Sequence, residues 1–255
     1  MGSEPDCEPE LEPPPQPATA RIASRNERER EAHASTLSPM STGAEAATRP
    51  REKDWWRRAV TVLWMPGETF RALREDSTEA AEARQEPLTA VVFLAGISIF
   101  LSTQTAGQLF DDRQFDLVIL VVEAIVAGLL VGLQNFWLVG GAVHLGARGN
   151  KGEGSYRQAR HLVGFAFVPF VLSLVAVWPI RLAIFGSDLF SSGGADGGAG
   201  GNVFRVLDAG FLVWSLGLLL LGMRTLNGWS WSRSFVALAL AGVFVVLFIA
   251  LAVVA

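Results

Sequence analysis

The residues of this chain that could do chemistry are a few polar side chains set in or beside long apolar runs. Glu123 and Gln134 are eleven residues apart, so on a helix they share one face to within about 20°. Burying an ionisable group in a membrane is costly, and such groups are the first candidates for function. The full set of candidates is Glu123, Gln134, Asn135, Arg181, Arg205 and Asp208.

Two interpretations of these side chains stay open. Glu123 is expected near the same membrane face as Arg181 and Arg205, so one of these could neutralise it. Asp208 follows Arg205 by three residues, a spacing at which two helical side chains can pair. The set therefore predicts either ion pairs that hold helices together or a site for a proton or a small substrate.

Enzyme signatures are missing from the sequence. His144 and His161 have no carboxylate or cysteine partners at metal-ligand spacing. The loop GNKGEGS (149–155) lacks the lysine–serine order of a phosphate-binding loop. Cys7 is the single cysteine, which excludes a disulfide framework. We therefore predict no catalytic residue, no cofactor and no metal site.

The elements that must position these residues are five apolar segments. A helix needs about 20 apolar residues to cross a hydrocarbon core of roughly 30 Å, and each segment is long enough. This pattern predicts an all-α integral membrane protein. A net charge of −4, which is unevenly distributed along the chain, gives no indication of nucleic acid as a partner. The expected spans are residues 88–110, 117–147, 162–183, 203–223 and 234–254.

The orientation of the spans follows from the cations beside them. With five spans, nine cations fall on one side and three on the other. The positive-inside rule then predicts a cytoplasmic N-terminus and an outside C-terminus, in the plasma membrane of a prokaryote. The nine are Arg71, Arg74, Arg84, Arg148, Lys151, Arg157, Arg160, Arg224 and Arg233, and the three are Arg113, Arg181 and Arg205.

Two further regions precede the spans. Residues 1–50 are acidic and rich in proline at their start, which predicts a disordered tail. Residues 51–86 should form short amphipathic helices, with Trp56, Val60 and Leu63 along one stripe. Tryptophans beside arginines are typical of helices that lie at headgroup depth. The expected interfacial anchors are Trp55, Trp56, Arg57, Arg58 and Trp64.

A ridge of small residues marks the second span. Gly128 and Gly132 form a GxxxG pair, and Gly140 continues the same face. Small residues let membrane helices approach closely. The ridge predicts packing within the helical bundle, with homo-oligomerisation as the alternative.

Three stretches in a fixed order resemble the Yip family, the Ypt/Rab-interacting membrane proteins, in its prokaryotic branch. They are PGETFRAL (66–73), GNKGEGSYRQA (149–159) and LGMRTLNGWSWSRSFVALAL (221–240), and the resemblance covers about residues 62–255. The resemblance implies a five-span Yip domain and a role in membrane organisation like that of trafficking proteins.

Two hypotheses for function follow. The first is a non-enzymatic scaffold or interaction protein whose partners are the lipid bilayer and membrane or cytoplasmic proteins. The second is a small transporter or channel that uses the polar residues within the spans, Glu123 and Asp208 foremost.

Overall fold

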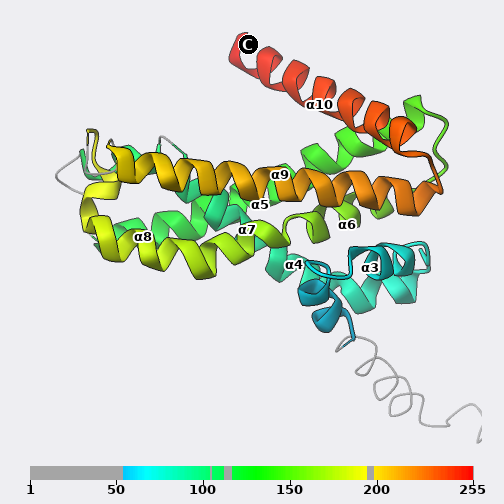
Figure 1. Ribbon diagram of the computed structural model, residues 1–255, viewed down its shortest axis with the longest axis horizontal. Coiled ribbons are helices and arrows are strands. Elements are labelled where there is room, and N and C mark those ends of the chain that lie inside the picture. Colours follow the sequence, from blue (N-terminus) through cyan, green and yellow to red (C-terminus); the bar gives the residue numbers. More distant parts are fainter. Residues whose placement is uncertain (1–53, 104, 112–116, 194–197, 255) are drawn as a thin grey trace, which may run out of the picture. The chain divides into compact units, whose positions relative to one another are not determined.

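The computed structural model describes residues 54–103, 105–111, 117–193 and 198–254. These residues form helices and turns without a β-strand (Figure 1). Five helical segments among them are long and apolar enough to cross a membrane, which confirms the prediction of an all-α protein with five spans. The expected tail and Arg113 lie outside the described residues.

The juxtamembrane region begins with helical residues 54–61. The remaining elements follow in the order α3 (Pro66–Ala72), α4 (Thr78–Leu101), η1 (Ala106–Asp111), α5 (Leu117–Gly149), α6 (Tyr156–Ala166), α7 (Val168–Leu172), η2 (Ser173–Val177), α8 (Trp178–Phe185), η3 (Gly186–Phe190), α9 (Ala199–Asn227) and α10 (Trp231–Val254).

The first span begins earlier than the expected residue 88. Ser77 caps α4 by accepting a hydrogen bond from the Ala80 amide, and Glu79 lies in the first turn, where a carboxylate suits the helix dipole. Pro87 is inside α4 rather than at its start. The end of the expected juxtamembrane region, 78–86, is therefore continuous with the first span.

The third span is broken at its prolines. Pro169 lies in the first turn of α7 and Pro179 in the first turn of α8, which follows the π-helical turn η2. At the first break the Phe170 amide donates to Phe167, so the Ala166 carbonyl needs another donor. The hydroxyl of Ser215 on α9 donates to it at 2.7 Å, and this contact satisfies the backbone within the span.

The small-residue ridge packs inside the chain. A Cβ atom on Gly96 of α4 would lie 2.1 Å from the Gly128 carbonyl oxygen and 2.6 Å from the Gly132 Cα of α5. A Cβ atom on Gly140 would lie 2.6 Å from the Arg160 side chain on α6. The ridge is therefore covered by α4 and α6 of the same chain, as expected for packing within the bundle.

The spans differ in how much of their surface the protein covers. In α4 and in the third span, half of the most apolar stretch is buried inside the protein. The corresponding share is 22% in α5, 28% in α9 and 17% in α10. The less covered helices expose large apolar side chains, as lipid-facing helices do. The first and third spans therefore form the centre of the bundle.

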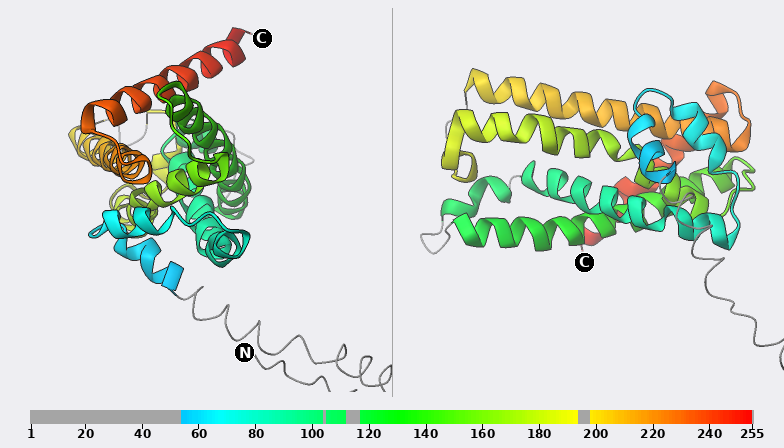
Figure 2. Two further views of the ribbon diagram at one scale, coloured as in Figure 1. Left: turned by 90° about the vertical axis from the view of Figure 1, so that its right-hand side faces the viewer. Right: turned by 90° about the horizontal axis from the view of Figure 1, so that it is seen from below.

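The loops and short elements gather at two ends (Figure 2). We call one the basic end; it comprises α3, residues 149–156 and the turn at 228–230. The other, which we call the opposite end, comprises η1 and η3, which contact each other. All nine cations that were counted on one side by sequence are among the described residues, in the juxtamembrane region or near the basic end.

Candidate functional site at the basic end

Asp76 is the centre of a polar network at the basic end. It lies in the link between α3 and α4. Its carboxylate accepts hydrogen bonds from Arg84 at 3.2 Å, from Arg157 at 2.9 Å and from the Ser155 hydroxyl at 2.5 Å. Charge-assisted bonds of this kind are stronger than neutral ones. One carboxylate thus joins the α3–α4 link to the start of α6.

Arg84 is the buried member of this network, with a side chain that is 0% exposed. Its Nε donates to His161 Nδ1 at 2.7 Å, and another nitrogen donates to the Glu75 carbonyl at 2.9 Å. The ring of Trp55 covers the guanidinium, whose carbon lies 5.6 Å from the ring centroid. Because Nδ1 accepts this bond, the His161 ring is neutral here with its proton on Nε2.

Gln158 ties the same two segments together a second time. It completes a capping box with Ser155 at the start of α6, which satisfies two amides of the first turn. Its side-chain nitrogen also donates to the carbonyls of Leu73 and Arg74. The stretches PGETFRAL and GNKGEGSYRQA, which are far apart in the sequence, therefore meet in space.

Sequence reasoning missed this network. Arg84 was counted only as a cation beside the first span, and His161 was considered only as a weak candidate for metal binding. The partners are 77 residues apart for Arg84 and His161 and 81 for Asp76 and Arg157. The one available signal was that both stretches are expected on the same side of the membrane.

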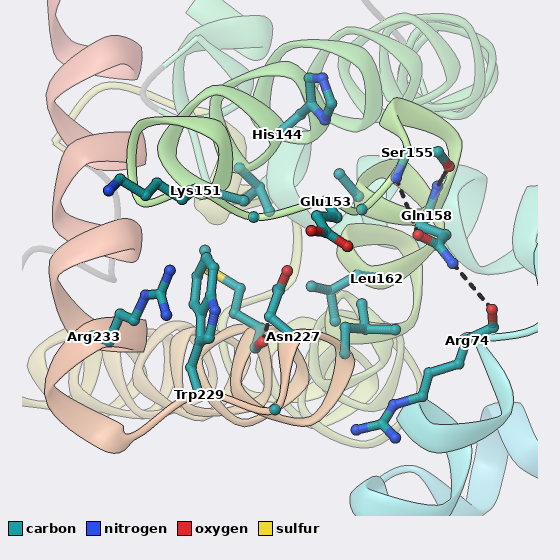
Figure 3. Close-up of a pocket in the computed structure, with 18 residues that line it drawn as sticks. Arg74, His144, Lys151, Glu153, Ser155, Gln158, Leu162, Asn227, Trp229 and Arg233 are labelled. Carbon is teal, nitrogen blue, oxygen red and sulfur yellow. Dashed lines mark hydrogen bonds between the residues drawn. The ribbon is translucent and has the colours of Figure 1, made fainter.

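A pocket of about 610 Å³ opens beside this network (Figure 3). The end of α5, the 150–155 loop, the start of α6 and the end of α9 surround it. Arg74 and Arg233 lie on opposite sides of it, and Glu153 points into it between them (Figure 3). Lys151 lies at its rim, and the Trp229 ring forms part of its wall.

The opposite end holds three of the six candidate residues. Arg181, Arg205 and Asp208 line a hollow of about 640 Å³ there. Arg181 pairs with Asp208 at 3.4 Å between α8 and α9. Arg205 donates instead to Asn202, so Asp208 pairs across two spans rather than with its helical neighbour.

The three candidates on α5 do not line that hollow. Asn135 donates to the Val131 carbonyl of its own helix at 2.9 Å. Gln134 is exposed and Glu123 is partly buried. The structure therefore brings together the members from α8 and α9 and leaves Glu123, Gln134 and Asn135 along a separate helix.

The expected interfacial anchors divide into two groups. Trp55 is buried against Phe165, with ring centroids 5.5 Å apart. The guanidinium carbon of Arg58 lies 4.7 Å from the centroid of the Trp55 ring. Trp56 is 41% exposed and Trp64 73% exposed, and Arg57 is exposed as well. The buried stripe is thus one residue earlier than the expected one.

The contacts of the juxtamembrane helix explain which of the two stripes is buried. Trp55, Ala59 and Val62 have the same i, i+4, i+7 spacing as Trp56, Val60 and Leu63 and are all buried in the core. Spacing alone cannot choose between the two stripes. Contact with α4 and α6 decides for the first, and so Trp56 and Val60 face outward.

The histidines have structural neighbours. The His144 ring packs on Tyr156, with centroids 5.7 Å apart, and His161 accepts from Arg84. Among the described residues, no group of three histidine, cysteine or acidic side chains could hold a metal ion.

Comparison with known proteins identifies relatives for most of the chain. The family model described as the Yip1 domain matches residues 60–254. An uncharacterised protein of the archaeon Methanocaldococcus jannaschii is 24% identical over 124 residues, which are 48% of this chain and 86% of that protein. No solved structure matches the chain significantly. The matched residues include every element described at the basic end from α3 onward.

Proposed function

Since this chain belongs to the Yip1 domain family of multi-pass membrane proteins, we propose that it is a non-enzymatic protein that organises membranes by binding lipids and other proteins. The bilayer surrounds its spans. The proposed binding surface is the outward face of residues 54–65, and we call it the juxtamembrane face.

One observation carries this proposal: the juxtamembrane segment has two apolar sides. Its inner side buries Trp55 and Val62 in the core. Its outer side exposes Trp56, Trp64 and Met65, the last at 58%, next to the exposed Arg57. Exposed aromatic and cationic residues in one short segment suit the headgroup layer or a partner in it.

Photo-crosslinking in cells tests this surface. A photoreactive amino acid at position 56 or 64 should form adducts with lipids or with specific proteins. The same amino acid at position 62, whose native side chain is 0% exposed, should crosslink only within the chain. If positions 56 and 64 give no more external adducts than position 62, the proposal is wrong.

The proposed location is the plasma membrane of a prokaryote, with the basic end in the cytoplasm and the C-terminus outside. The gathering of cations near one end supports this orientation. Cys7 is the only thiol, so a membrane-impermeant maleimide should label it only after cells are opened. Labelling of Cys7 in intact cells would show that the N-terminus lies outside and that the proposed orientation is wrong.

Homo-oligomerisation is a separate proposal. The ridge on α5 is covered within the chain and is not free to bind a second copy. Of the five spans, α10 has the smallest buried share of its apolar stretch, 17%. Crosslinking between copies through α10, and not through Gly128 or Gly132, is the expected pattern.

The transporter hypothesis has weaker support. The hollow at the opposite end contains the Arg181–Asp208 pair, yet the candidates on α5 do not line it. Reconstituted liposomes decide the question, since Asp208→Asn should change a flux if one exists. A flux equal to that of empty liposomes would exclude the hypothesis.

A further inference from the structure

The pocket at the basic end carries an excess of positive charge. Its rim holds Arg74, Lys151 and Arg233, and Glu153 is the one carboxylate among its described lining residues. Three cations against one anion leave a local excess of two positive charges. A concave site with such a field attracts anions.

The two arginines keep hydrogen-bonding capacity for a ligand. Arg74 donates from Nε and from one terminal nitrogen to the Thr225 carbonyl. Arg233 donates to the Asn150 carbonyl. Neutral carbonyls leave the charge in place, and a guanidinium has five N–H donors. Each arginine is thus fixed at a helix end and can still bind an anion.

Apolar side chains form part of the pocket wall beneath this rim, beside polar ones such as Asn227. Leu162 and Met223 are 1% exposed and line it together with Trp229. Arg233 lies over the Trp229 ring, 4.6 Å from its centroid. A ligand with a charged group and an apolar part would fit both surfaces, and a lipid headgroup with its glycerol has this character.

Lys151 adds an independent observation. Its φ angle is +59°, in the left-handed region. Glycine or asparagine adopts this conformation most easily after a helix, and other side chains do so at some cost. Strain of this kind often accompanies function. Here it keeps a cation at the pocket rim, where it extends toward α10 (Figure 3).

From these features we propose that the pocket binds the phosphate of an anionic phospholipid headgroup. Lys151 and Arg233 bind the phosphate on the side near α10, and Arg74 contributes its charge from the other side. Basic pockets between membrane helices are suited to anionic headgroups. This inference deepens the proposed function by naming a lipid class, and it uses residues outside the juxtamembrane face.

The test is lipid binding by the purified full chain. Short-chain phosphatidylglycerol, short-chain phosphatidylcholine and glycerol phosphate are the three probes, and the readouts are bound lipid by native mass spectrometry and ligand-dependent thermal stabilisation. Phosphatidylglycerol should bind at least about tenfold more tightly than the other two. Equal binding of phosphatidylcholine would overturn the proposal. Equal binding of glycerol phosphate would indicate a site for a soluble phosphate and would also overturn it.

Variants locate the binding in the pocket. Lys151→Asn should weaken phosphatidylglycerol binding about fivefold, with the fold retained because asparagine suits the left-handed conformation. Arg71→Gln is the matched control, since Arg71 is an exposed cation outside the pocket lining. If Arg71→Gln weakens binding as much, the effect is general surface charge and the proposal is wrong.

Glu153→Gln provides a second discriminating result. Removing the negative charge should strengthen phosphatidylglycerol binding. Weaker phosphatidylglycerol binding would mean that the excess positive charge of the pocket does not attract the lipid, and this result would overturn the proposal. The crosslinks from positions 56 and 64 are measured in the same variants. If these crosslinks persist when Lys151→Asn weakens lipid binding, the two sites act separately.

Discussion

The two ends of the helical unit hold their charges in different ways. At the basic end one carboxylate, Asp76, binds three side chains, and one of them is the fully buried Arg84. At the opposite end Asp208 and Arg181 form a longer pair of 3.4 Å whose carboxylate is 28% exposed. Charges at the basic end fix the connections between helices, whereas the pair at the opposite end joins two spans at one point.

This difference explains why the three stretches that resemble the Yip family lie at the basic end. The stretches PGETFRAL and GNKGEGSYRQA meet around Asp76 and Gln158, and LGMRTLNGWSWSRSFVALAL supplies Thr225 and Arg233 to the same end. Lipid-facing helices need only apolar side chains. Specific residue types are needed where polar groups must satisfy one another.

The largest expected effect is the difference in stability lost when each of the two carboxylates is removed. Asp76→Ala should lower the free energy of unfolding by roughly 3–5 kcal/mol, because it leaves buried Arg84 without its counter-charge. Asp208→Ala should cost about 1 kcal/mol, because its pair is partly exposed. Thermal unfolding of the two variants in one detergent compares them. Equal losses would remove the distinction between the ends.

A smaller loss of stability is expected when His161 can no longer accept the hydrogen bond from Arg84. His161→Phe should cost about 1–3 kcal/mol, since the Arg84 Nε loses its partner inside the protein. His161→Asn places an oxygen near the position of Nδ1 and should recover at least half of that loss. Thermal unfolding midpoints provide the measurement. A phenylalanine variant as stable as the asparagine variant would show that the ring acts by packing alone.

The smallest expected effect lies at the opposite end and depends on pH. Hydrogen bonds from the Ser192 hydroxyl and amide lower the pKa of Asp111. Since the folded pKa is depressed, the stability that these bonds contribute is fully present above the ordinary pKa of about 4 and is lost as pH falls through the lower folded value. Ser192→Ala should therefore reduce the acid-side dependence of the unfolding midpoint. A variant with an unchanged pH profile would contradict this.

The spans could be predicted from the sequence because length and apolar character determine them. Their ends could not be predicted as well. The apolar run predicted a span that begins at residue 88, but Ser77 caps a helix that begins at Thr78 and passes through Pro87. The face of the juxtamembrane helix was also ambiguous, because Trp55 and Trp56 both begin a stripe of equal spacing.

The network could not be predicted for a different reason. Asp76, Arg84 and His161 become partners only when α4 and α6 pack together, and no local pattern encodes that contact. The candidate polar residues were found by their rarity in apolar runs. Rarity identified Arg181 and Asp208, which do pair. The partners expected for Glu123 were Arg181 or Arg205, but Arg181 pairs with Asp208 and Arg205 donates to Asn202.

The hydrogen bond between Ser215 and the Ala166 carbonyl has a consequence for biosynthesis. During synthesis the break at Pro169 is made before its donor, since Ser215 comes 49 residues after Ala166. Until then the carbonyl lacks its donor in a medium without water. We expect the third span to stay beside the insertion machinery until the fourth arrives, so that the two helices leave it as a pair.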